Sequence, residues 1–239
     1  MRDDGAAAEQ LRVEGLNAFY GESHVLHGVD FAVGRGECVC LLGRNGVGKT
    51  TTLRAVMGIL PKRTGTIRYE GHELIRLRSN DIARLGIAYC PDERGIFASL
   101  NVEENLMLPP AVKPGGMTVG EIYALFPNLA ERRRSQGTKL SGGEQQMLAI
   151  ARILRTGATL LLLDEPTEGL APVIVQKIRD VMLQLKAHGF TMLLADQNFR
   201  FAATVADRHY VMEDGRIVDS FHSSEIEANL DKLHKYLGV

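Results

Sequence analysis

The pattern G-x-x-x-x-G-K-[ST] occurs at residues 43–50, between a continuously apolar stretch and a segment with helical character. Glycines let the backbone wrap a phosphate chain, so that N–H groups of the loop and of the following helix start point inward. Lys49 supplies a positive charge for the β- and γ-phosphates, and the Thr50 hydroxyl is a ligand for Mg²⁺. A Gly-rich turn is the alternative, but the position between a buried strand and a helix favours phosphate binding. The residues expected to contact the nucleotide are Gly43, Arg44, Asn45, Gly46, Val47, Gly48, Lys49, Thr50 and Thr51.

Two adjacent carboxylates, Asp164 and Glu165, end the apolar run Leu160–Leu163. In an open α/β sheet the ligand crevice lies at the carboxyl ends of the strands, so we expect this pair beside the phosphate loop, residues 43–50. Asp164 is then positioned to hold Mg²⁺, and Glu165 to accept a proton from the attacking water. An Asp-Glu pair after a strand is usually only the start of a helix. The phosphate loop in the same chain favours the catalytic interpretation.

The signature segment, Leu140-Ser-Gly-Gly-Glu-Gln145, begins a helix with Ser141 at the N-cap and Glu144 three residues later, as in a capping box. Two glycines in the first turn, Gly142 and Gly143, weaken the helix but leave its N–H groups accessible to an approaching anion. The phosphate loop already surrounds one side of a triphosphate, so the anion facing this helix needs a separate explanation.

Short strands and helices alternate along the chain, which predicts an α/β fold with a largely parallel sheet. We expect strands at residues 11–16, 26–33, 38–42, 66–69, 86–90, 160–163 and 190–195, with a hairpin turn at Asp214-Gly215 between 209–213 and 216–218. Helices are expected from Lys49 to about Leu60 and from Pro172 to just before Gly189, with a mostly helical stretch over about 101–155.

The composition argues against several classes of protein. Lys and Arg together number 28 against 29 Asp and Glu, so no overall charge favours nucleic acid or an anionic membrane surface. The polar start of the chain does not resemble a signal peptide, and no apolar run approaches the roughly 20 residues of a spanning helix. The three cysteines, Cys38, Cys40 and Cys90, have no zinc-site spacing and are interpreted as buried strand thiols.

Taken together, the phosphate loop, the Asp164-Glu165 pair and the signature segment resemble the ABC ATPase family, over about Leu11 to Val239. The resemblance implies a P-loop NTPase fold with a largely parallel core sheet, an N-terminal antiparallel β-subdomain and an inserted α-helical lobe. It implies a single domain, 1–239, with its nucleotide-binding core at about 8–100 and 156–220, the lobe at about 101–155 and a tail at 221–239. In that family the signature segment of one subunit meets the ATP held by the phosphate loop of the other. This arrangement explains the anion expected at Ser141, Gly142, Gly143 and Glu144.

Three further site residues follow from the resemblance. Tyr20, 23 positions before Gly43, matches the aromatic that stacks on adenine, although a strand-end tyrosine can instead pack on its own sheet. Asp92 stands in the lid loop, Pro91–Arg94, where many members have Gln, and is a candidate Mg²⁺ ligand or a turn-forming residue. Gln197 stands at the switch position usually held by His, and it can hydrogen-bond the γ-phosphate but cannot carry a proton.

These departures resemble the LivF-type ATPases of branched-chain amino-acid importers, as do Gly169-Leu-Ala-Pro172 and Tyr236-Leu-Gly238. The resemblance implies ATP and Mg²⁺ as cofactors, and a second ATP-binding subunit, identical or LivG-like, as partner. It also implies two transmembrane permease subunits, indirectly a solute-binding protein, no nucleic acid, and a location at the cytoplasmic face of the inner membrane.

Residues Asp92 to Leu106 are the expected docking surface for the permease. A urea or amide importer is an alternative, because the solute does not touch this chain. A soluble ABC ATPase acting on nucleic acid or the ribosome is a remote one, as the chain lacks sustained heptads and a basic excess. A P-loop kinase would leave the signature segment without a purpose.

Overall fold

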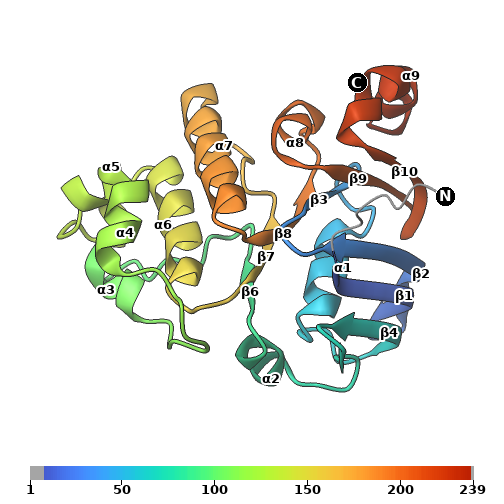
Figure 1. Ribbon diagram of the computed structural model, residues 1–239, viewed down its shortest axis with the longest axis horizontal. Coiled ribbons are helices and arrows are strands. Elements are labelled where there is room, and N and C mark those ends of the chain that lie inside the picture. The colour runs from blue at the N-terminus through green and yellow to red at the C-terminus, as the bar shows by residue number, and fades with distance from the viewer. Residues whose placement is uncertain (1–7, 238–239) are drawn as a thin grey trace.

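The structure is a computed structural model that describes residues 8–237. Residues 1–7, which form most of the polar start of the chain, and Gly238 of the C-terminal motif lie outside the described residues. Figure 1 shows an antiparallel sheet on one side, a cluster of helices on the other, and a second sheet between them.

The antiparallel sheet has the strand order β2-β1-β4-β5. Leu11 and Val13 point into the core, and beyond the register shift around Gly15 the buried positions become Leu16 and Ala18. Such a bulge re-aims the side chains of a strand by one position, which keeps both halves of β1 in contact with the core. The strands are β1 Glu9–Tyr20, β2 Ser23–Gly34, β4 Arg63–Tyr69 and β5 His72–Glu73.

The central sheet has six strands in the order β10-β9-β3-β8-β7-β6, and all neighbours are parallel except the β9–β10 hairpin. The largely parallel sheet and the turn at Asp214-Gly215 confirm the predictions from sequence. Strands β3, β7 and β8 are buried along their whole length, as their uninterrupted apolar runs require. The bounds are β3 Cys38–Leu42, β6 Ile87–Cys90, β7 Leu160–Asp164, β8 Thr191–Asp196, β9 Arg208–Glu213 and β10 Arg216–His222.

Two hydrophobic cores lie on the two faces of this central sheet. Cys38, Cys40 and Leu42 of β3 face the core shared with α6 and α7, whereas Val39 and Leu41 face the core shared with α1 and the antiparallel sheet. The alternation along one strand therefore fixes α1 and α6 on opposite faces of the same sheet, as Figure 1 also shows. The helices named here are α1 Lys49–Val56, α6 Gly142–Leu154 and α7 Pro172–Ala187.

The predicted helical stretch over 101–155 consists of four helices separated by loops and a 3₁₀ turn, Gly137–Lys139. Ser141 forms the expected capping box at the start of α6, Asn101 forms a second one at the start of α3, and Pro172 opens α7. The remaining helices are α2 Ser79–Arg84, α3 Val102–Met107, α4 Val119–Leu125, α5 Pro127–Glu131, α8 Phe199–Val205 and α9 Ile226–Leu237.

One helix boundary predicted from the sequence was wrong. Helix α1 ends at Val56 rather than near Leu60, because Gly58 adopts a left-handed conformation with φ of 73°. The N–H of Ile59 then donates to the Arg54 carbonyl at 2.9 Å, which closes the helix with a Schellman-type turn. In addition, the pattern did not predict α2, α8 or the C-terminal helix α9.

Candidate nucleotide-binding site

The phosphate loop runs from the end of β3 to the start of α1. Neighbouring atoms lie close to Gly43 and Gly48, the two glycines of its sequence pattern. A Cβ at Gly43 would lie 2.6 Å from the Met212 carbonyl oxygen, and one at Gly48 would lie 2.7 Å from the Leu26 side chain. Gly48 also has a φ of 112°, which side-chain-bearing residues rarely adopt. Both positions therefore require glycine for close approach and backbone shape, and the loop can bring its N–H groups to a phosphate.

Lys49 is almost completely buried, with 3% of its surface exposed. Its ammonium donates to the carbonyl oxygens of Gly43 at 2.8 Å and Arg44 at 2.9 Å, and lies 3.3 Å from a carboxylate oxygen of Glu165. Loop carbonyls and a carboxylate thus hold the positive charge at the centre of the loop, where a phosphate would compete for it.

Asp164, at the end of β7, lies opposite the first turn of α1. The Thr50 hydroxyl donates to one of its carboxylate oxygens at 2.9 Å, and the Tyr89 hydroxyl donates to the other at 2.8 Å. Burial raises the pKa of Asp164, while these two hydrogen bonds lower it. Two hard oxygen donors on adjacent elements fit Mg²⁺, which binds through one or two protein ligands together with phosphates and water.

Glu165 follows Asp164 in a left-handed backbone conformation, with φ of 43°, which is uncommon for a residue with a side chain. The backbone N–H of Glu165 donates to the Ala195 carbonyl at 2.8 Å, which fixes this turn against β8. Burial raises the pKa of Glu165, the hydrogen bond with Glu168 raises it further, and Lys49 lowers it. A raised pKa with a fixed orientation suits a group that must accept a proton.

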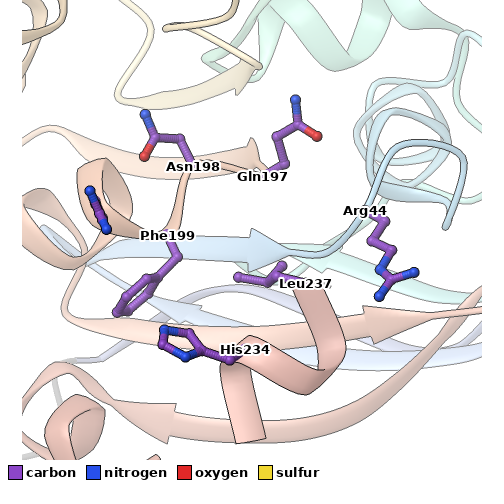
Figure 2. Close-up of a pocket in the computed structure, with 7 residues that line it drawn as sticks. Arg44, Gln197, Asn198, Phe199, His234 and Leu237 are labelled. Atoms are coloured by element: carbon purple, nitrogen blue, oxygen red, sulfur yellow. The ribbon is translucent and has the colours of Figure 1, made fainter. Parts of the chain in front are cut away.

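The end of β8 contributes Asp196 and Gln197. Asp196 accepts hydrogen bonds from the Asn198 N–H at 2.7 Å and the Thr167 hydroxyl at 3.2 Å, and burial raises its pKa to about 6. The next residue, Gln197, is exposed and lines a hollow of about 470 Å³ together with Arg44. Figure 2 shows these two side chains on either side of the hollow, with His234 and Leu237 of α9 below them.

The start of α6 is exposed at Ser141, whose backbone N–H and hydroxyl donate to the Glu144 carboxylate at 2.7 and 2.8 Å. Glu144 also lies 3.8 Å from Arg132. The two glycines have different surroundings, because a Cβ at Gly143 would lie 2.7 Å from Ile174 of α7, whereas one at Gly142 would meet only the end of the Arg94 side chain. Packing against α7 therefore requires glycine at 143, which sequence reasoning attributed to exposure of the N–H groups.

Tyr20 ends β1 with 43% of its surface exposed, so its ring is not buried in its own sheet. The hydroxyl of Tyr89 raises the pKa of the Arg54 guanidinium on α1, burial lowers it, and the hydroxyl of Tyr20 raises it further. Arg54 also lies 3.9 Å from Asp92 of the lid loop, and the charge of Asp92 is close enough to raise the pKa of Asp164.

The structure thus brings Lys49, Thr50, Asp164 and Glu165 together, as the sequence predicted, and places Gln197 and Arg44 beside the same loop. The signature segment lies on the other face of the central sheet from α1. Sequence reasoning missed Tyr89 and Arg54, because neither belongs to a motif and only the pairing of β6 with β7 places Tyr89 next to Asp164.

Comparison with known proteins identifies the family of this chain. Residues 26–168 match the family described as ABC transporter. The chain is 41% identical to the high-affinity branched-chain amino acid transport ATP-binding protein BraG of Pseudomonas aeruginosa, covering 95% of this chain and 99% of the relative. It is 37% identical to the probable branched-chain amino acid transport ATP-binding protein LivF of Archaeoglobus fulgidus, covering 90% of this chain and 93% of the relative.

Solved structures show the same fold. A nucleotide-free ATP-binding cassette from an ABC transporter superposes with a TM-score of 0.83 at 25% identity, covering 97% of this chain and 99% of that chain. An ATP-binding subunit of an ABC transporter superposes with a TM-score of 0.79 at 29% identity, covering 96% and 100%. The fold and site define a P-loop nucleotide-binding protein. More narrowly, the chain belongs to the ABC transporter family and is an ABC-type ATPase. Within residues 8–237, no helix is both long and apolar enough to span a membrane.

Proposed function

We propose that this ATPase hydrolyses Mg²⁺-bound ATP at two sites shared between two ATP-binding subunits, and so drives uptake of branched-chain or other hydrophobic amino acids. The observation that carries the chemistry is the convergence of two distant segments. The Thr50 hydroxyl lies 2.9 Å from Asp164, and the Lys49 ammonium lies 3.3 Å from Glu165.

Each of these residues has one task in the proposed reaction. Lys49 and the loop N–H groups bind the phosphates, Thr50 and Asp164 hold the Mg²⁺, and Glu165 orients the attacking water and takes its proton. The metal, when bound, neutralises charge that develops on the phosphates. Gln197 donates to the γ-phosphate without exchanging a proton, and Tyr20 offers its exposed ring to the adenine. Asp92, which lies 3.9 Å from Arg54, is a further candidate ligand for the Mg²⁺.

The signature segment is proposed to complete the site of the second subunit. Ser141 is exposed at the positive end of a 13-residue helix, and its capping box leaves the first turn well ordered. Because α6 and α1 pack on opposite faces of one sheet, the segment is poorly placed to serve the phosphate loop of its own chain. A second copy or a LivG-like relative would bring the two together.

The proposed transport role rests on the relatives. BraG and LivF are named as ATP-binding proteins of branched-chain amino acid transport, and this chain matches nearly all of BraG. By analogy, two transmembrane permease subunits would hold the chain at the cytoplasmic face of the inner membrane, with a solute-binding protein delivering the amino acid. The division of the chain into a nucleotide-binding core, a helical lobe over about 101–155 and a C-terminal tail stays a prediction.

The loop between β6 and α3 is the proposed permease contact. Phe97 is 54% exposed there, so its ring is available to a partner. The buried Asn105 accepts a hydrogen bond from the Phe97 N–H at 2.9 Å and donates to the Phe97 and Leu100 carbonyls at 3.1 and 3.2 Å. The loop is therefore held in shape by a side chain on the following helix.

The test is to purify the tagged chain from its own membranes, identify the co-purifying membrane proteins, and reconstitute the complex in vesicles with ATP inside and the solute-binding protein outside. Uptake of leucine or isoleucine that requires ATP and stops in the Glu165→Gln variant is the expected result. Uptake of urea or an amide in place of leucine would contradict the assigned solute but not the ATPase chemistry. A complex with no membrane protein would contradict the transport role itself.

A further inference from the structure

Each carboxylate oxygen of Asp164 accepts a hydrogen bond, and the two donors lie on different secondary-structure elements. Thr50 donates from α1 at 2.9 Å, and Tyr89 donates from the neighbouring strand β6 at 2.8 Å. Asp164 is 99% buried, with 1% of its surface exposed, so its orientation depends on these partners rather than on solvent. Thr50 is itself a proposed metal ligand, which leaves Tyr89 as the donor whose task is to orient the carboxylate.

We propose that Tyr89 is a positioning residue that fixes the orientation of Asp164 toward Mg²⁺ through its 2.8 Å hydrogen bond. This inference rests on the proposed role of Thr50 and Asp164 in holding the metal. A partner that orients a metal ligand contributes substantially to metal affinity, and its loss typically weakens binding 10- to 100-fold.

The test measures ATP binding by calorimetry over a series of Mg²⁺ concentrations and again in EDTA, with no hydrolysis readout. Tyr89→Phe removes one hydroxyl and keeps the ring. We expect it to need roughly tenfold more Mg²⁺ for half-maximal enhancement of ATP affinity, with unchanged ATP affinity in EDTA. Tyr123→Phe is the matched control, because its hydroxyl is also buried, has no hydrogen-bond partner, and lies in α4 of the helical lobe.

A Tyr89→Phe protein with a parent-like Mg²⁺ requirement would overturn the proposal. An equal loss of ATP affinity with and without Mg²⁺ would assign Tyr89 a role in folding and also overturn the proposal.

The Asp164→Asn variant separates this inference from the proposed function. If the parent protein responds to Mg²⁺ and Asp164→Asn does not, the metal site stands, and the Tyr89 result alone decides the inference. If Asp164→Asn responds like the parent, the proposed metal site itself is wrong.

Discussion

Replacing Glu165 by Gln tests the proposed chemistry most directly. The amide has the shape of the carboxylate, and its oxygen can still accept from Lys49, which lies 3.3 Å from the carboxylate in the parent. The left-handed backbone at residue 165 and its hydrogen bond to Ala195 do not depend on the side chain. The substitution therefore removes the basic group and one negative charge while the site keeps its geometry.

Loss of the basic group should slow turnover, whereas loss of the negative charge should tighten ATP binding. A positioned general base contributes about 10²- to 10⁴-fold, so turnover should fall by that factor, or about 3–5 kcal/mol in the barrier. The Lys49–Glu165 attraction at 3.3 Å is on the order of 5 kcal/mol at an effective dielectric of 20. ATP competes with Glu165 for this lysine, and relief of only about 1.4 kcal/mol of that attraction would tighten ATP binding about tenfold.

The assay combines phosphate release under saturating Mg²⁺-ATP with ATP affinity and with gel filtration in the presence of ATP. Glu165→Gln should hydrolyse ATP at least about 100-fold more slowly, bind it more tightly and accumulate as an ATP-bound dimer. Glu168→Gln removes an exposed neighbouring carboxylate and should retain most of the turnover. Near-parental turnover in Glu165→Gln would refute its assignment as the base, and weaker ATP binding would refute the competition for Lys49.

Three further predictions concern the phosphate loop, the signature segment and a buried histidine. Lys49→Ala should weaken ATP binding about 10- to 100-fold by calorimetry, and an unchanged affinity would contradict the phosphate-binding role. Ser141→Arg should leave ATP binding to the monomer intact but abolish dimerisation and turnover; Ser141→Ala, which loses about 1 kcal/mol of helix capping, controls for the cap. Burial lowers the pKa of His209 to about 4 from its usual 6.5, so protonation favours the unfolded chain and stability falls as the pH drops from 6.5 toward 4. In urea unfolding, the parent should lose about 1.4 kcal/mol more than His209→Gln between pH 7.5 and 5.5, and equal losses would contradict the assignment.

Local signals in the sequence were sufficient for the parts of the fold that depend on neighbouring residues. Continuous apolar runs predicted the buried strands β3 and β7, and the Ser141–Glu144 spacing predicted a capping box that the structure confirms. Pro172 and Asp214-Gly215 likewise predicted a helix start and a hairpin turn that are present. Each of these features is decided within a few residues of the chain.

Features that depend on distant contacts were not predictable in the same way. The hydrogen bond from Tyr89 to Asp164 spans 75 positions and exists because β6 and β7 are neighbours in the sheet. Gly143 is required by Ile174, which belongs to a helix that begins almost thirty residues later. The sequence shows a glycine at position 58, but it does not show whether helix α1 ends there or continues to Pro61. Tertiary packing decides this by favouring the left-handed conformation of Gly58.

The arrangement of the sheet also supports the proposal that two chains contribute to each ATP site. The phosphate loop follows β3, and Asp164 and Asp196 end β7 and β8. These three strands are parallel neighbours in the sheet, so their carboxyl ends place one half of the proposed site along one edge. The start of α6 belongs to the core on the face opposite α1, and Gly143 packs tightly against α7 on that face. A contact between Ser141 and the phosphate loop of the same chain would require α6 to leave both α7 and its buried core. In the proposed dimer, a second subunit would supply the same helix start with α6 still packed in its core, so dimerisation would be the lower-energy route to a closed site.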